Sequence, residues 1–258
     1  MSPMATAPAI PKAMARVRNT EGKCPREARK FIFDLLKYND NGNNEYSDYY
    51  YTSNLMTALA NSLIPVKQKG DGIVYGAEED EDELAAFRQA AVEEIERYRR
   101  MDEWILSYQN IYTRTALSCK KALMKAKIIP HNPAELFAYT HDGTMDLVRL
   151  EAFDGMTELG CLSNDNLLKY FISVMSTDAS PFVRRKMYET FFLWLGAVAL
   201  GEYSNTSSSP ATPEQDMDGD TLIVEDVVSQ EAKKALLART TSIEGALKAL
   251  REELKDNK

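Results

Sequence analysis

The residues of this chain best suited to metal binding or nucleophilic catalysis are two histidines and three cysteines. His131 precedes an asparagine and His141 an aspartate, so the His-Glu-x-x-His motif of a zinc peptidase is missing, and two histidines cannot make a three-histidine site. Cys24, Cys119 and Cys161 are too far apart in sequence for a zinc knuckle or a redox dithiol. We therefore expect reduced, buried thiols in an intracellular protein, and no catalytic residue, metal site or cofactor site.

Glycine and acidic motifs also give no reaction centre. Gly70, Gly72 and Gly76 miss the dinucleotide-binding fingerprint by one position, and no Gly-Lys-Ser/Thr phosphate loop occurs. The acidic stretch 216–220 and the Asn-rich loop after Asp40 lack the glycine and glutamate that a calcium loop needs at its sixth and twelfth positions. The chain is therefore expected not to be an enzyme and to have no small-molecule substrate.

The composition indicates a folded chain that does not span a membrane. Of its 258 residues 44% are apolar and 27% charged, which excludes a disordered chain and a membrane bundle. The longest apolar run, over 191–200, is about half the length of a bilayer-spanning helix. The formal charge of −8 makes nucleic acid a poor default partner.

Apolar periodicity predicts an all-α protein. One stripe over 28–36 and a second over 55–63, separated by the Asn-rich segment 39–44, indicate two antiparallel helices around a tight polar loop. Further helices are expected over about 84–98, 103–127, 133–140, 144–160, 164–176 and 181–201. The weak strand candidates are 72–75 and 221–224. The expected organisation is a flexible leader over 1–22, a HEAT-like helical repeat domain over 23–202, a Ser/Thr/Pro-rich linker or insertion over 203–228, and C-terminal amphipathic helices over 229–258.

An internal repeat supports this fold class. Thr113-Arg114, Val148-Arg149 and Val183-Arg184 recur at a spacing of 35, which is typical of one helix pair in an α-solenoid. In the later two units an aspartate precedes the pair, and the Asp…Pro-x-Val-Arg pattern resembles a HEAT repeat. We expect the aspartate to accept hydrogen bonds from backbone N–H groups of the first helical turn and the valine to pack inward. The arginine is expected to reach an aspartate or loop carbonyl of a neighbouring repeat. The alternative is that the 35-residue spacing arises by chance. These repeat positions are Asp142, Val148, Arg149, Asp178, Pro181, Val183 and Arg184.

Three sequence blocks resemble a known family. They are Leu36-Lys37-Tyr38-Asn39-Asp40-Asn41 with Tyr46-Ser47-Asp48 and Leu59-Ala60-Asn61, Phe137-Ala138-Tyr139-Thr140 with Val148 to Phe153, and Asp178 to Met187. On these residues the chain is similar, over about 25–200, to the TBP-associated factors that form subunit 2 of transcription initiation factor TFIID. The similar region follows the family's aminopeptidase-like portion, which this chain lacks. The resemblance implies a nuclear scaffold of HEAT-like repeats that contacts other TFIID subunits near core-promoter DNA.

Two groups of residues are candidates for partner contacts. Tyr46, Tyr49 and Tyr50 are expected either to pack between helices or to form a partner-binding face. Arg114, Lys120, Lys121 and Lys125 form a basic stretch without an intervening acid, expected to be a solvated helix face or a weak, salt-sensitive DNA contact. The acidic run 78–83 is interpreted as a helix entry or an acidic docking tail.

The sequence thus predicts a non-enzymatic scaffold segment of TFIID, working in RNA polymerase II pre-initiation complex assembly and core-promoter recognition. Its partners are expected to be other TFIID subunits in the nucleus, with promoter DNA contacted weakly through basic faces and no membrane. The alternatives are a stand-alone HEAT adaptor protein and the helical C-terminal domain of an M1-type aminopeptidase.

Overall fold

A computed structural model describes residues 9–19, 22–66 and 81–200, and all regular secondary structure in these residues is helical. The predicted linker over 203–228, the C-terminal helices over 229–258 and both strand candidates lie outside the described residues. The chain divides into two compact units, 1–161 and 162–258, which are described separately. An all-α chain of helical repeats, as the sequence predicts, is confirmed for the described part.

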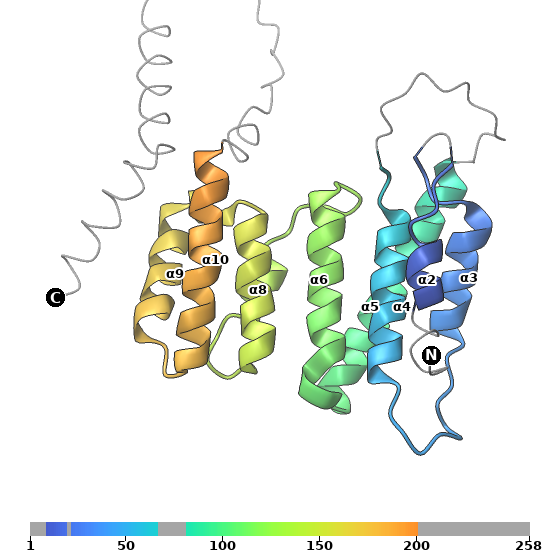
Figure 1. Ribbon diagram of the computed structural model, residues 1–258, viewed down its shortest axis with the longest axis horizontal. Coiled ribbons are helices and arrows are strands. Elements are labelled where there is room, and N and C mark those ends of the chain that lie inside the picture. Colours follow the sequence, from blue (N-terminus) through green and yellow to red (C-terminus); the bar gives the residue numbers. More distant parts are fainter. Residues whose placement is uncertain (1–8, 20–21, 67–80, 201–258) are drawn as a thin grey trace, which may run out of the picture. The chain divides into compact units, whose positions relative to one another are not determined.

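In unit 1, successive helices form stacked hairpins (Figure 1). The elements are α2 (Ala9–Met14), α3 (Arg26–Lys37), α4 (Tyr49–Leu63), α5 (Glu81–Trp104), α6 (Ile111–Lys125), α7 (Ala134–Phe137) and α8 (Asp146–Glu158), with a 3-10 turn, η1 (Tyr108–Asn110), before α6. The second helices of the three hairpins, α4, α6 and α8, lie side by side. Each hairpin therefore buries its apolar stripe against the next, as in an α-solenoid.

The first hairpin shows how the sequence pattern becomes packing. Ile32 and Leu36 of α3 are fully buried, as are Leu55 and Leu59 of α4, so both predicted stripes face the core. The Asn-rich loop is held by its own side chains, because Asn39 Nδ2 donates to Asp48 Oδ2 (2.5 Å) and to a hydroxyl in α4. Burial of the two stripes drives the hairpin, and the loop's hydrogen bonds fix its turn.

The 35-residue repeat marks equivalent helix starts. α6 begins at Ile111, α8 at Asp146 and α10 (Pro181–Ala199, in unit 2) at Pro181. The third residue of each helix is the repeat's Thr113, Val148 or Val183, and all three are buried. The predicted inward packing of this position is confirmed. In unit 2, α10 packs against α9 (Asp165–Thr177).

The polar repeat positions make hydrogen bonds within the turn that precedes each helix. Arg149 Nη2 donates to Asp142 Oδ1 at 2.9 Å and its Nε to the Thr140 carbonyl, while Arg184 donates to the Asp178 carbonyl. These bonds close the turn before the arginine's own helix, and the contact with a neighbouring repeat stays a prediction. The side chain that caps α10 is Ser180, which accepts from the Val183 N–H, and Asp178 instead accepts from the Ser180 N–H.

One predicted boundary is wrong, and one segment is helical where a loop was expected. The helix expected over 103–127 is interrupted, because α5 continues to Trp104 and α6 starts only at Ile111. Residues 9–14, placed by the sequence in a flexible leader, form α2 and pack on α4. This segment escaped detection because its buried residues, Pro11 and Ala15, give no recognisable stripe.

Arg18 fastens this N-terminal segment to the end of α4. Its Nη2 donates to the carbonyls of Asn61 (3.0 Å) and Ile64 (3.1 Å) at the helix C-terminus. A guanidinium at this end also complements the negative pole of the helix dipole.

We expect Arg18→Met to lower the free energy of unfolding by about 1–2 kcal/mol, because charge-assisted hydrogen bonds to α4 are lost while the apolar stem remains. Arg16→Met makes the same charge change at an exposed position and should stay within about 0.5 kcal/mol of the unchanged chain. Urea unfolding measures both variants, and equal midpoints would contradict the contact between this segment and α4.

Candidate functional site

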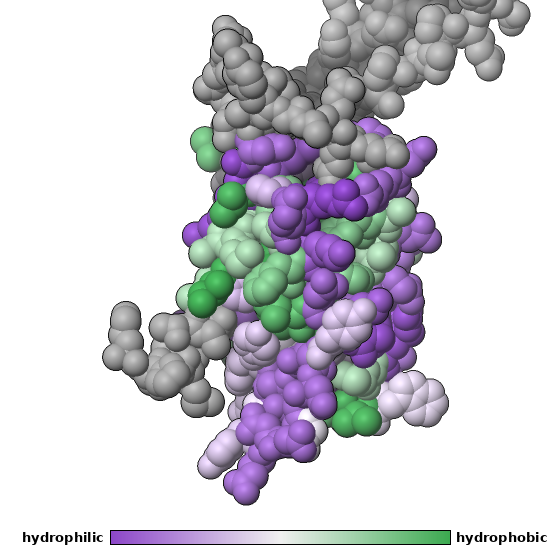
Figure 2. All heavy atoms as spheres, turned by 90° about the vertical axis from the view of Figure 1, so that its right-hand side faces the viewer, coloured by the Kyte–Doolittle hydropathy of each residue, from purple (hydrophilic) through white to green (hydrophobic). Residues whose placement is uncertain are grey.

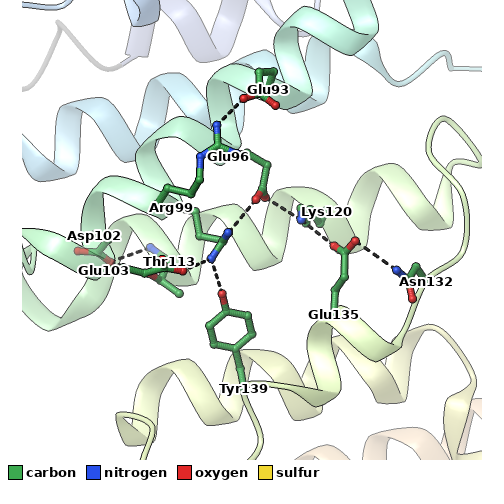
Figure 3. Close-up of polar contacts among 11 residues, drawn as sticks. Glu93, Glu96, Arg99, Asp102, Glu103, Thr113, Lys120, Asn132, Glu135 and Tyr139 are labelled. Atoms are coloured by element: carbon green, nitrogen blue, oxygen red, sulfur yellow. Dashed lines mark hydrogen bonds and ion pairs between the residues drawn. The ribbon is translucent and has the colours of Figure 1, made fainter.

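A network of charged side chains joins α5, α6 and the α7 region (Figure 3). Glu96 of α5 receives Arg99 Nε at 2.7 Å and Lys120 Nζ of α6 at 2.7 Å. Lys120 also contacts Glu135 of α7 at 2.6 Å, and Arg99 Nη1 donates to the Tyr139 hydroxyl at 2.6 Å. The predicted basic residue Lys120 is therefore a junction between three helical segments.

Lys121 makes the corresponding connection from α6 to α8. Its Nζ lies 2.6 Å from Asp154, 2.9 Å from Glu158 and 3.4 Å from Glu151. Lys125, one turn further along α6, contacts Glu158 at 3.2 Å. The side chains of Lys120 and Lys121 are each 12% exposed, whereas that of Lys125 is 64% exposed.

The pKa values of these groups follow from their partners. Burial alone would lower the pKa of Lys121, but its hydrogen bonds to Asp154 and Glu158 outweigh burial and raise it. Burial would raise the pKa of Glu158, yet Lys121 and Lys125 bring it below the ordinary value. The pKa of Glu96 is lowered in the same way by Lys120 and Arg99. Lys121, Glu158 and Glu96 are therefore charged at neutral pH, and each lies beside partners of opposite charge.

This arrangement corrects the interpretation of the basic stretch. The sequence shows no acid between Arg114 and Lys125, but the fold supplies acids from α5, α7 and α8. Lys120 and Lys121 are neither a solvated face nor free to contact phosphate. Arg114 is half-buried on α6, and Lys125 keeps an exposed charge beside Glu158.

The structure divides the tyrosine cluster between two roles. Tyr49 is half-buried, and its ring lies edge-on to Tyr112 with centroids 5.5 Å apart. Tyr112 in turn contacts Tyr98, whose hydroxyl donates to the Leu36 carbonyl at 3.0 Å. Burial raises the pKa of Tyr112 to about 12, so this hydroxyl stays protonated. Tyr46 and Tyr50 are largely exposed at the same end of the unit.

Sequence reasoning missed a buried carboxylate and the apolar loop that follows it. Asp102 is 1% exposed, and its two oxygens accept from the Ser107 N–H (2.6 Å), the Thr113 N–H (3.0 Å) and the Thr113 hydroxyl (2.7 Å). Between these anchors lie the exposed side chains Trp104, Ile105 and Leu106. The one signal available in the sequence was this apolar run, which lies outside the stripes of the helices on either side.

Among the described residues, no group of three or more His, Cys, Asp or Glu side chains is placed to hold a metal ion. Within the same residues, no helix is both long enough and apolar enough to cross a bilayer. All three cysteines are free; Cys24 and Cys119 are buried as expected, and Cys161 is half-buried. Burial raises the pKa of Cys119 to about 12, which keeps its thiol protonated and unreactive.

A comparison with protein families decides what these helical repeats are. The family described as "TAF2-like, TPR repeats" matches residues 6–197, which include every described helix of unit 1 and most of α10. The chain belongs to this family. TPR units are helix pairs of about 34 residues, so the description agrees with the 35-residue spacing and assigns the repeats to the TPR type, where the sequence suggested HEAT.

Three relatives of this TAF2-like chain are each named transcription initiation factor TFIID subunit 2. The protein from Schizosaccharomyces pombe is 34% identical over 96% of this chain and 20% of its own length. The proteins from Danio rerio and Drosophila melanogaster are 32% and 29% identical over 69% of the chain and 15% and 14% of their own lengths. The chain therefore spans about a fifth or less of these relatives.

Each of the three blocks that suggested the TAF2-like family includes a turn between paired helices and part of a neighbouring helix. The first includes residues of the α3–α4 loop and α4, the second of the α7–α8 turn and α8, and the third of the α9–α10 turn and α10. Side chains of all three blocks make hydrogen bonds that close these turns, including those of Asn39, Arg149 and Ser180. The resemblance therefore rests on residues with a specific structural role.

Lys121→Met should lower the free energy of unfolding by about 2–3 kcal/mol, because it leaves neighbouring carboxylates without their shared cation. Lys125→Met removes a mostly exposed partner of the same Glu158 and should cost less than about 1 kcal/mol. Urea unfolding at neutral pH tests the pair, and an equal loss in both variants would contradict the structural role of Lys121.

Lys121→Met should also change how the free energy of unfolding depends on pH in the acid range. The folded pKa of Glu158 lies below its ordinary value of 4.5, so the unfolded chain binds more protons as the pH falls. The stabilisation is complete above that value and is lost as the pH falls through the lower, folded pKa. Since Lys121→Met removes the main cause of this shift, the variant should lose less stability between about pH 5 and pH 3 than the unchanged chain.

Proposed function

We propose that this chain is a non-enzymatic scaffold segment of TFIID that acts through protein–protein contacts with other TFIID subunits. Its place would be the nucleus, in assembly of the RNA polymerase II pre-initiation complex and in core-promoter recognition. The support is the family membership and the relatives, each named as a TFIID subunit and none of those cited as an enzyme. Stacked helix pairs provide the extended surfaces that such contacts use.

One observation carries the scaffold proposal. In unit 1, charged side chains such as Lys120 and Lys121 lie between helices, whereas several large apolar side chains are exposed at the surface. Trp104 is 88% exposed and Tyr46 is 72% exposed. On the face that Figure 2 shows, hydrophobic residues also form a patch bordered by hydrophilic ones. Contiguous apolar surface of this kind is typical of protein interaction sites.

Promoter DNA is a less favoured direct ligand of α6. Two of the four candidate cations are neutralised inside the network, and Lys125 lies beside Glu158. Any DNA contact by this chain would be weak and salt-sensitive, because few free cations remain on α6 to displace counterions.

Affinity capture tests the proposal. The tagged chain is incubated with nuclear extract, and bound proteins are quantified by mass spectrometry against tag alone. We expect enrichment of TFIID subunits that persists at moderate salt, since apolar contacts are less screened than ionic ones. Capture of cytoplasmic trafficking or signalling proteins without any TFIID subunit would contradict the proposal and favour the stand-alone adaptor.

A further inference from the structure

We propose that the α5–α6 loop and the adjoining α3–α4 loop of unit 1 form a docking surface for a basic, amphipathic peptide segment of another protein. The inference goes beyond the scaffold role and does not require the partner to be a TFIID subunit. Four exposed side chains carry it: Trp104 (88%), Ile105 (69%), Leu106 (69%) and Tyr108 (58%).

These four side chains lie within five consecutive residues. Soluble proteins seldom expose so many large apolar groups together unless the surface meets a partner. Tryptophan and tyrosine are also the residue types that most often dominate the energy of protein interfaces. The buried member of the segment, Ser107, is the one that points inward: its N–H donates to Asp102 Oδ1, and its hydroxyl accepts from the Tyr112 N–H at 3.3 Å.

The loop is held in place before any partner binds. Asp102 joins its two ends through Ser107 and Thr113, so the segment cannot swing away from the helices. Gln109 and Asn110, next in the chain, both have left-handed backbone, at φ 55° and 49°. Consecutive left-handed residues other than glycine are costly and occur where the surroundings fix them, often at functional sites. A rigid apolar loop loses little conformational entropy on binding.

The α3–α4 loop extends the apolar surface. The ends of α3 and α5 and the starts of α4 and α6 lie at one end of unit 1, as Figure 1 shows. The Tyr49–Tyr112 ring contact and the hydrogen bond from the Tyr98 hydroxyl to the Leu36 carbonyl confirm that these ends adjoin. This end also exposes the rings of Tyr38, Tyr46 and Tyr50. Together the two loops present seven large exposed side chains, which we call the apolar end.

The charges around the apolar end select a basic partner. Among the described residues, its exposed, unpaired carboxylates are Asp40 and Glu45, while the exposed Glu103 is paired with Arg99. The cations nearby are Lys37, which is exposed, and Arg100, which is paired with Glu93. A negative rim in a chain of net charge −8 attracts cationic segments and repels acidic ones. Apolar anchors flanked by lysine or arginine therefore match this surface best.

Fluorescence anisotropy of the full chain with a labelled peptide tests the proposal. The probe is a helical peptide of about 16 residues, with leucine and phenylalanine on one face and lysine elsewhere, and its twin carries glutamate in place of each lysine. We expect the lysine peptide to bind at least about tenfold more tightly than the glutamate twin. Equal binding of the two peptides would overturn the predicted charge of the partner.

The double substitution Trp104→Ser, Leu106→Ser should weaken binding of the lysine peptide about tenfold or more, because it removes two central anchors. Phe192→Ser with Leu193→Ser removes equally exposed apolar side chains from α10 in unit 2 and should leave binding unchanged. Equal binding by the unchanged chain and the Trp104 variant, or an equal loss in both variants, would overturn the assigned surface.

Folding and self-association are controlled separately. All four substituted side chains are exposed, so the thermal unfolding midpoints should match that of the unchanged chain, and Ile105→Lys serves as a second test if the first variant unfolds. Sedimentation of the chain alone should give a monomer. If the chain self-associates and the Trp104 variant does not, the apolar end binds a second copy of this chain, and the proposed peptide partner is wrong.

Discussion

Two adjacent lysines on α6 carry the contacts that hold unit 1 together across its hairpins. Neighbouring residues on a helix point about 100° apart, so Lys120 reaches α5 and α7 while Lys121 reaches α8. Each ammonium group is largely removed from water and depends on two or three carboxylates to remain charged there. The buried apolar residues of α6 pack on α4. α6 thus connects all three hairpins: its lysines form ion pairs with α5, α7 and α8, and its apolar residues pack on α4.

The use of α6 lysines between helices explains which side chains remain exposed on unit 1. Side chains that the sequence suggested for an outward basic face are used between helices, and the loops at one end carry aromatic and aliphatic groups instead. The described part of this TAF2-like chain therefore has little exposed positive charge on α6 and much exposed apolar area. A surface of that kind suits contact with protein better than contact with a phosphate backbone.

Much of the fold could be predicted because its determinants are local. The stripes of α3 and α4 and the 35-residue spacing of helix starts are properties of short segments, and both are visible without knowing the neighbours. The interruption after Trp104 was not predictable in this way, since it depends on Asp102 accepting hydrogen bonds from residues on the far side of the loop. α2 was missed because small buried residues leave no periodic pattern. The roles of Lys120 and Lys121 were missed because their partners lie on other helices.

A stack in which hairpins contact mainly their neighbours has consequences for how it opens. Such arrays lose structure from their edges, since an edge repeat has one interface to break and an inner repeat has two. In unit 1, α6 has neighbours on both sides and carries the ionic links, so its amide hydrogens should exchange with solvent last. The N-terminal segment around α2, fastened to α4 by Arg18, belongs to an edge. Fraying there would leave the central hairpin intact, and with it the part of the apolar end that the α5–α6 loop forms.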